Sequence, residues 1–430
     1  MKMNKWTLGL AAVGLVSLTS AARAEEAKTT PLLSALSATT ISGYVDTSAV
    51  WNPGTGNLSP APFRFNAGKQ DGFNIDSVDV KLAKPLEEGQ WSSGYTVDLM
   101  FGPDAVIVNH GDAAAPVSGL GVSDIVRQAY LTLRMPVGNG IDWKIGRFDC
   151  ALGYESTDAY KDPNFTRSYG YTFEPTEHTG IMAEYKINDG IALSGGVANT
   201  VTTGPFMNQR SPRAESKKAF MGMVNLTAPE SWGAIGGSGL YAGIDYGPGA
   251  VTEDRTHVYV GATIKTPVQG LTLGVAWDSI NHMDVPGAFA AGSTDTGYAT
   301  AIAAYASFKL TDKASIHLRG EYARGAALGA LADVYNGTAN TQFAPGAFGG
   351  NPLRKVIALT GTFQYDLWQN VISRLEVRWD HQADGAASAF GGKSFGAVSG
   401  GGELAGPAFD SLQGSKRNDV MVAANLIFKF

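Results

Sequence analysis

The segment Val371–Asp380, VISRLEVRWD, alternates residue by residue between two kinds of side chain. One set, from Val371 to Trp379, is mostly apolar, and the intervening positions carry Ile372, Arg374, Glu376, Arg378 and Asp380. Strict alternation is the pattern of a β-strand, because successive side chains of a strand point to opposite faces of the sheet. This strand therefore separates an apolar environment from a strongly charged one.

The same alternation returns along most of the chain, and sixteen segments between Ile41 and Phe430 fit it. The connections between them alternate between short turns, such as PVGNG and NDG, and mostly long segments, such as 52–73 and 381–414. Short periplasmic turns and long extracellular loops are typical of bacterial outer-membrane barrels. We therefore predict an all-β protein, a transmembrane antiparallel β-barrel of about 16 strands, with about 14 or 18 as the alternatives.

Two features favour a barrel with lipid outside over a soluble β-sandwich with the same alternation. The chain finishes on the alternating segment 418–430, NDVMVAANLIFKF, whose terminal Phe resembles the signal that delivers outer-membrane barrels to their assembly machinery. Aromatic side chains also gather near predicted strand ends, as in the girdles at the two membrane interfaces. The predicted girdle residues are Tyr95, Phe101, Trp277, Trp379, Phe428 and Phe430.

The first 24 residues have the pattern of a secretory signal peptide. Lys2 and Lys5 precede a mostly apolar stretch, and Ala22-Arg23-Ala24 fits a cleavage site. We expect residues 1–24 to be cleaved, 25–40 to form a periplasmic lead-in and 41–430 to form the barrel in the outer membrane. No other apolar run approaches the roughly 18 residues of a membrane helix.

Composition narrows the classes of function. Removal of residues 1–24 would take the net charge from −6 to −9, which disfavours a nucleic-acid partner. Cys150 is the single cysteine and has no partner for an internal disulfide. The histidines show no metal-ligand spacing and no nucleophile motif is present, so we expect no catalytic residues, no metal site, no cofactor and no enzyme activity.

The long connection after the fifth predicted strand carries a recognisable sequence. GRFDCALGYESTDAYKDPNFTRSY (146–169), followed by EPTEHTGIMAEY (174–185), resembles the OmpL-like family of outer-membrane β-barrel porins. ISGYVDTSAVWN (41–52) and FNIDSVDVKLAKP (73–85) resemble the same family in the same order. The resemblance implies the barrel fold and outer-membrane channel activity. The family carries no well-defined catalytic or ligand residues to transfer.

We predict that Asp149–Glu177, the third long loop, folds into the lumen, as the third loop of sixteen-stranded porins does. Its carboxylates would form the acidic side of a constriction: Asp149, Glu155, Asp158, Asp162, Glu174 and Glu177. The wall would present the basic side and its polar neighbours: Arg147, Arg319, Arg374 and Arg378, with His317, Glu321, Glu376 and Asp380. Opposed charges would create a transverse field that orients polar solutes and sets ion preference. Alternatively, these charges pair with one another and brace the wall, or lie in a solvated loop.

The alternation places Arg147 on the lipid-facing side of its strand, which conflicts with a position in the lumen. It shares the face of Trp143 and Ile145, which would turn a charge toward lipid at a cost of roughly 2–4 kcal/mol near the membrane centre. Either Arg147 lies at the outer rim, or Gly146 marks a β-bulge that turns Arg147 inward. The bulge is the favoured interpretation.

These observations together predict a porin that allows passive diffusion of small hydrophilic solutes and ions through a water-filled lumen. The alternatives are a channel selective for sugars or anions, and a plugged barrel with an adhesive or structural role at the cell surface. Beyond solutes, the expected partners are outer-membrane lipid, the barrel assembly machinery and, by analogy with general porins, two further copies in a homotrimer.

Overall fold

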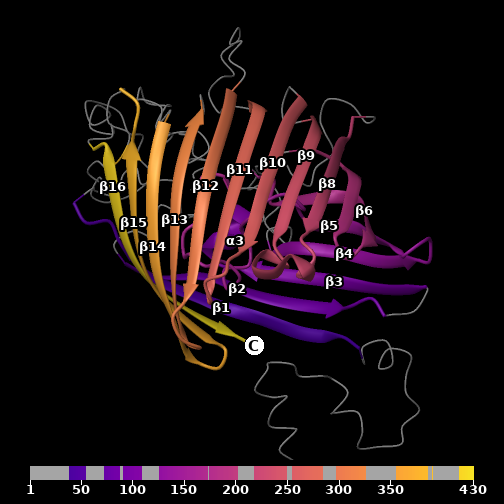
Figure 1. Cartoon of the computed structure of the whole chain (residues 1–430), viewed down its shortest axis with the longest axis horizontal. Coiled ribbons are helices and arrows are strands. Elements are labelled where there is room, and N and C mark those ends of the chain that lie inside the picture. The colour runs from indigo at the N-terminus through magenta and orange to yellow at the C-terminus, as the bar shows by residue number, and fades with distance from the viewer. Residues whose placement is uncertain are drawn as a thin grey trace, which may run out of the picture.

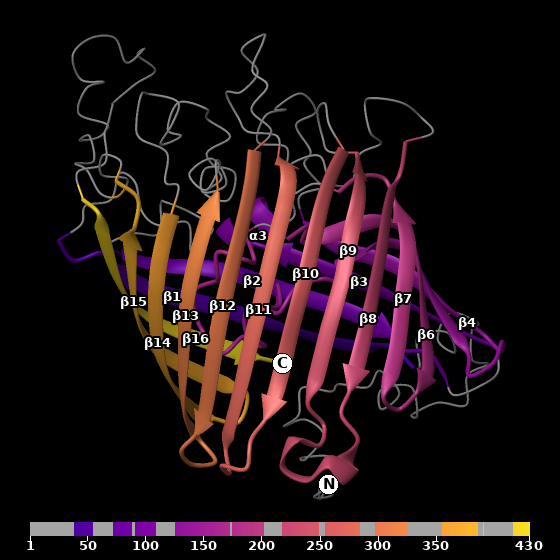
Figure 2. The same cartoon turned by 45° about the horizontal axis from the view of Figure 1, so that its top comes forward.

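A computed structural model describes residues 38–54, 72–87, 91–108, 125–172, 174–201, 217–248, 254–283, 297–325, 355–385, 390 and 416–430. Within these residues, 16 strands form one closed antiparallel barrel, and each strand pairs with its neighbours in the sequence (Figures 1 and 2). The predicted fold class and strand number are confirmed. The signal peptide 1–24, most of the lead-in 25–40 and most of the long connections lie outside the described residues.

The strands follow one another around the barrel in sequence order. They are β1 (Thr40–Trp51), β2 (Gly72–Lys84), β3 (Ser92–Phe101), β4 (Val126–Met135), β5 (Ile141–Asp149), β6 (Glu177–Asn188), β7 (Ile191–Ala198), β8 (Ala219–Thr227), β9 (Gly239–Pro248), β10 (Asp254–Lys265), β11 (Leu271–Met283), β12 (Gly297–Lys309), β13 (Ala314–Gly325), β14 (Lys355–Trp368), β15 (Val371–Gln382) and β16 (Asn418–Lys429). Two short helices are also described, α3 (Pro103–Val108) and the 3-10 helix η5 (Glu230–Ile235). No helix among these residues is long and apolar enough to cross a membrane.

The last strand closes the barrel against the first. β16 pairs with β1 from Tyr44 opposite Lys429 to Trp51 opposite Val422. Main-chain hydrogen bonds of 3.0 Å in both directions between Gly43 and Phe430 extend this pairing beyond the last residue of β16. Closure leaves no free sheet edge, which is the condition for a sheet that spans lipid.

The two faces of the wall have opposite character. In β15, Leu375 and Val377 are 53% and 50% exposed on the outside, whereas Arg378 and Asp380 are fully buried on the inside. β13 repeats the pattern, with Leu318 54% exposed outside and Arg319 buried inside. The interior therefore concentrates charge and the exterior concentrates apolar surface, the inverse of a soluble domain.

The predicted girdle residues all lie on the outer face, but not all lie near a rim. Phe101, Phe428 and Phe430 are exposed near strand ends, and Tyr95 and Trp379 are half-buried. Trp277 lies opposite Val260 and Ile302 in the middle of β11, because this strand continues to Met283. The expectation that Trp277 marks a strand end is therefore wrong.

The β-bulge expected at Gly146 is absent. The pairing of β5 with β4 and with β6 runs without a register shift through this residue. Gly146 has a φ of +135°, and a Cβ there would lie 2.8 Å from the Cα of Tyr130. Glycine is therefore required because β4 and β5 approach closely. Arg147 is close to the end of β5, where Glu177 accepts a 2.6 Å hydrogen bond from its Nε. The structure thus supports the alternative, a position of Arg147 at the rim of the barrel.

Candidate functional site

The segment between β5 and β6, residues 150–176, crosses the interior of the barrel and contacts the wall opposite its point of entry. Figure 2 shows its purple and magenta trace behind β9–β12, inside the ring of strands. We call this segment the lumen loop. Its hydrogen bonds to the far wall join residues that are up to 215 positions apart in the sequence.

Glu376 of β15 is the first anchor of the lumen loop. Its two carboxylate oxygens accept hydrogen bonds from the main-chain N–H groups of Phe165, at 2.6 Å, and Thr166, at 3.0 Å. The hydroxyl groups of Thr166 and Thr362 donate one further bond each, both 2.6 Å long. A buried carboxylate needs such donors, because burial without them costs several kcal/mol.

Arg319 of β13 is the second anchor. Its guanidinium group donates to Glu155 at 2.8 Å, to the carbonyl oxygen of Thr166 at 2.7 Å and to that of Arg167 at 3.1 Å. It also forms a 2.7 Å bond with Glu321 of its own strand. The planar fork of donors on arginine can therefore hold several points of the loop at once.

Two more arginines, both in β15, bind main-chain oxygens of the lumen loop. Arg374 donates to the carbonyl oxygens of Ala159, at 3.0 Å, and Asp162, at 2.6 Å. Arg378 donates to the carbonyl oxygen of Arg167 at 2.7 Å and forms a bidentate pair with Asp380 at 2.8 and 2.9 Å. Both guanidinium groups are buried, so these bonds are protected from water.

The strand between these arginines explains how they converge. Thr360 of β14 lies opposite Arg319 on one side and Arg378 on the other. The neighbouring inward position of β14 is Ala358, which separates Glu321 from Asp380. The small side chains of β14 leave space on the inner face of the sheet for the loop backbone. The long side chains of β13 and β15 extend into this space and bind that backbone.

A further anchor holds the loop from the opposite direction and was missed by the sequence analysis. Arg127 of β4 is buried and forms ion pairs with Asp98 at 2.5 Å, Asp158 at 2.8 Å and Asp149 at 3.0 Å. A register shift between Asp98 and Leu99 places both Arg127 and Gln128 in the interior. Simple alternation assigns these two neighbours to opposite faces. Because of the bulge, the sequence pattern did not predict that Arg127 faces the interior.

The predicted acids and arginines therefore lie in direct contact and do not face each other across water. Arg319, Arg374 and Arg378 are at most 4% exposed. Arg319 and Arg378 form ion pairs with carboxylates of the loop and wall, whereas Arg374 binds main-chain carbonyl oxygens of the loop. The expected basic side of an open constriction is corrected accordingly: these arginines bind the loop. This arrangement corresponds to the alternative in which the charges brace the structure, because a buried cation is stable only with a close acceptor.

The other predicted residues divide between the rims and the loop interior. Asp149 and Glu177 are the end residues of β5 and β6 and pair with Arg127 and Arg147. Glu174 is buried next to Gly153, and burial, with Asp278 and Glu155 adding to it, raises the pKa of Glu174 well above its usual range. His317 accepts or donates a 2.9 Å hydrogen bond with Ser307 and faces the lumen.

The lumen loop also borders an open part of the lumen. A cavity of about 750 Å³ lies between it and the strand ends that lead into short turns. The loop contributes Tyr154, Tyr160, Lys161 and Asp162 to its lining, and the wall contributes Glu184, Ser194, Asn225, Thr263, Ser307 and Gln364 among others. The lining combines polar and apolar groups in similar measure and carries both signs of charge, so it can accommodate water and hydrophilic solutes.

Two loop carboxylates next to this cavity differ in their ionisation. Burial raises the pKa of Asp162 to about 7, although Arg167, whose Nη2 lies 3.0 Å from it, opposes this shift. Burial also opposes ionisation of Asp158, but Arg127 and Lys161 outweigh it and lower the pKa of Asp158. Lys161 is half exposed and lies 2.6 Å from Asp158. Asp158 is thus a permanent anion, whereas Asp162 titrates near neutral pH.

Solved structures of porins resemble this barrel. An anion-selective porin from Comamonas acidovorans aligns with a TM-score of 0.53 at 12% identity, covering 91% of this chain and 99% of that chain. OmpF of Salmonella typhi, in complex with daunomycin, gives 0.52 at 14% identity, covering 91% and 97%. A trimer form of OmpT of Vibrio cholerae gives 0.51 at 12% identity, covering 91% and 99%. At these identities the likeness concerns the fold.

The sequence provides the family assignment. No curated protein matches the chain. The family model "Putative beta-barrel porin-2, OmpL-like" matches residues 38–409, which is most of the chain and includes both the lumen loop and its anchors in β13–β15. Together with the closed barrel, this match shows that the chain belongs to the OmpL-like beta-barrel porin-2 family and is an outer-membrane porin.

Proposed function

We propose that this porin conducts small hydrophilic solutes and ions by passive diffusion, with the lumen loop, residues 150–176, as its constriction. The observation that carries the proposal is the position of the loop, which crosses the lumen and is bonded to β4 on one side and to β13–β15 on the other. A barrel of this size is too wide for wall side chains to fill, so the loop determines which solutes pass.

The charged groups that contact solutes in this scheme are those on the cavity side of the loop. Lys161 and Asp162 of the loop and Glu184 of the wall line the cavity. The buried carboxylates Glu155 and Glu174 and the wall arginines act on solutes only indirectly, by fixing the loop. We therefore expect a weak ion preference that is governed by few residues.

A sugar channel remains the second candidate because of one specific feature of the lining. Tyr154, Tyr160, Tyr241 and Tyr259 all border the cavity, and Tyr154 stacks on Tyr305 with ring centroids 4.2 Å apart. Aromatic rings present flat apolar faces with a polar edge, which suits the faces of sugar rings. Block of the ionic current by added oligosaccharides would distinguish this candidate from a general porin.

We further propose the cellular setting of the channel. Residues 1–24 would be cleaved on export, β16 would be recognised by the barrel assembly machinery, and the short turns would face the periplasm. A homotrimer is supported by the trimer form of the structurally similar OmpT. Mass determination of the purified protein, by light scattering in detergent, tests this assembly.

Conductance in planar bilayers tests the function directly. Purified barrel should give steady, ohmic current steps in potassium chloride, and the reversal potential in a salt gradient should report the ion preference. A folded barrel that gives no current steps would contradict the diffusion channel and would favour the plugged surface barrel. A matched barrel lacking residues 156–168 should give larger steps if the lumen loop is the constriction.

A further inference from the structure

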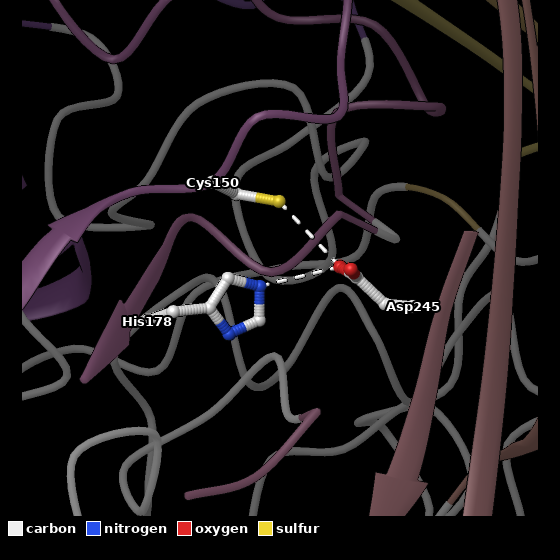
Figure 3. A group of neighbouring side chains, drawn as sticks. All are labelled: Cys150, His178 and Asp245. Atoms are coloured by element: carbon white, nitrogen blue, oxygen red, sulfur yellow. Dashed lines mark hydrogen bonds and ion pairs between the residues drawn. The ribbon is translucent and has the colours of Figure 1, made fainter. Parts of the chain in front are cut away.

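Three side chains from separate parts of the sequence converge where the lumen loop begins and ends. Cys150 begins the loop, His178 follows it in β6, and Asp245 belongs to β9. Figure 3 shows the thiol and the imidazole ring both directed at the carboxylate of Asp245. One donor atom from each residue lies within 4.8 Å of the other two.

The separations between these donor atoms are those of a metal site. His178 Nε2 lies 3.2 Å from Asp245 Oδ2, and Cys150 Sγ lies 3.6 Å from the same oxygen. Tetrahedral zinc, with bonds of about 2.0–2.3 Å, places neighbouring N, O and S ligands roughly 3.3–3.6 Å apart. The separation of 3.6 Å falls in this range and that of 3.2 Å lies just below it.

The chemistry of the group also fits a cation. Asp245 is fully buried, and His178 is its only ion-pair partner among the described residues. Oδ1 of Asp245 and Nδ1 of His178 accept or donate no hydrogen bond within the same residues. The main-chain N–H of Leu152 donates a 3.3 Å bond to Cys150 Sγ, which stabilises a thiolate. In the structure the Cys150 thiol donates to Asp245. A divalent cation that replaced the thiol proton would supply the positive charge that the buried carboxylate lacks.

A second, smaller cavity borders the thiol side of the group. Cys150 lines a cavity of about 240 Å³ between the two limbs of the loop, together with Leu152, Glu174 and Thr176. This volume accommodates several water molecules, so solvent has access to the side of the group that Cys150 forms; His178 and Asp245 do not line this cavity.

We propose that Cys150, His178 and Asp245 bind Zn²⁺, with the thiol releasing its proton to solvent and the ion binding the thiolate. The ion would fasten both ends of the lumen loop to β9. A 2.9 Å hydrogen bond from the N–H of Cys150 to the carbonyl oxygen of Thr176 already joins the two ends, so one ion fixes both. The sequence analysis predicted no metal site because the ligands lie far apart in the chain.

Another cluster of acids provides a contrast. Asp79, Asp98 and Asp158 also bring three carboxylates together, but Arg127 lies among them and forms an ion pair with each. Its guanidinium group occupies the position that a cation would need. The cysteine-containing cluster has no such cation among the described residues.

The experiment uses Co²⁺ as a spectroscopic probe of the folded full-length barrel in detergent. Cobalt bound through a thiolate gives an intense sulfur-to-metal charge-transfer band, and added Zn²⁺ should remove it by competition. We expect one Co²⁺ per chain, loss of the charge-transfer band in Cys150→Ser, and at least about tenfold weaker binding in His178→Asn and Asp245→Asn.

A second buried pair supplies the matched control. His257 Nε2 lies 3.0 Å from Asp278 Oδ1, and both residues are as buried as the proposed ligands, but no cysteine lies beside them. His257→Asn should therefore keep the band and the affinity. Absence of the band in the unmodified protein, or its persistence in Cys150→Ser, would overturn the proposal.

A measurement on the unmodified protein covers the case in which a variant does not fold. Cys150 is the single cysteine, so alkylation adds one mass increment per chain. Zn²⁺ should slow alkylation of Cys150 at least about tenfold, and a chelator should restore the original rate. Equal rates with and without Zn²⁺ would also refute the site.

Discussion

The carboxylate of Glu376 accepts two hydrogen bonds from Thr166, one from its main-chain N–H at 3.0 Å and one from its hydroxyl group at 2.6 Å. One residue belongs to the wall of the barrel and the other to the tip of the lumen loop. The constriction therefore depends on wall positions that solutes do not touch. Most of the testable consequences follow from this separation between residues that hold the loop and residues that face the lumen.

Glu376→Gln should loosen the tip of the lumen loop. The amide keeps the shape of the carboxylate but not its charge, and each charge-assisted bond lost or weakened is worth roughly 1–2 kcal/mol. We expect larger conductance and more current noise in single-channel recordings. Glu184→Gln, which removes a cavity carboxylate that pairs with Lys144 and not with the loop, is the control and should leave the noise unchanged. Equal noise in both variants would contradict the anchoring role.

Arg378→Met should destabilise the folded barrel. Asp380 would then remain buried without its bidentate partner, and breaking a buried pair in this way costs roughly 3–5 kcal/mol. Arg134→Met is the matched control, because Arg134 and Asp142 form a partly exposed pair worth about 1 kcal/mol or less. Unfolding by urea can be followed on gels run without heating, on which folded and unfolded barrels form separate bands. The midpoint urea concentrations of the two variants give the difference in stability. A similar loss of stability in both variants would refute the argument.

The attachment of the lumen loop to the wall should weaken as the pH rises, because Asp162 becomes ionised. Its pKa in the folded protein is about 7, above the usual 3.8, because burial disfavours the charged form. Stability from this group is therefore fully present below about pH 4 and is lost as the pH rises through about 7. Current noise should therefore increase between about pH 4 and 7 and level off above that, and Asp162→Asn should remove most of the increase. An unchanged pH profile in the variant would assign the titration to another group.

Lys161→Glu should change the ion preference without loosening the loop. Lys161 is half exposed at the cavity, so reversing its charge changes the field that ions meet. We expect the reversal potential in a salt gradient to shift toward cations. Lys186→Glu makes the same change of charge on an exposed residue that pairs with Asp189 near a short turn, and it should produce a much smaller shift. A larger shift of the reversal potential in Lys186→Glu would show that Lys161 does not govern the ion preference.

Much of the fold follows from alternation, whereas the site depends on its exceptions. VISRLEVRWD predicts both faces of β15 correctly, because a regular strand repeats every two residues. Arg127 escaped notice because a bulge in its pairing with β3 reverses the parity at that point. Cys150, His178 and Asp245 meet only after the barrel closes, and no local pattern connects residues 95 positions apart. Alternation also does not show that the wall arginines are long enough to contact the loop. They are, so the opposed charges meet each other and not water.

The separation in sequence between the lumen loop and its anchors has a consequence for biogenesis. Residues 150–176 are synthesised early, but the groups of β13–β15 that hold them follow 152 or more positions later. A nascent or partly assembled sheet that ends before β13 contains the loop without those anchors. Contacts between such distant residues form late because closing long loops is entropically costly. The side of the constriction that rests on β13–β15 therefore forms only when the last quarter of the chain joins the sheet. An intermediate arrested before that point would hold the loop by earlier strands alone, such as through Arg127 and Asp158, and would have a wider opening.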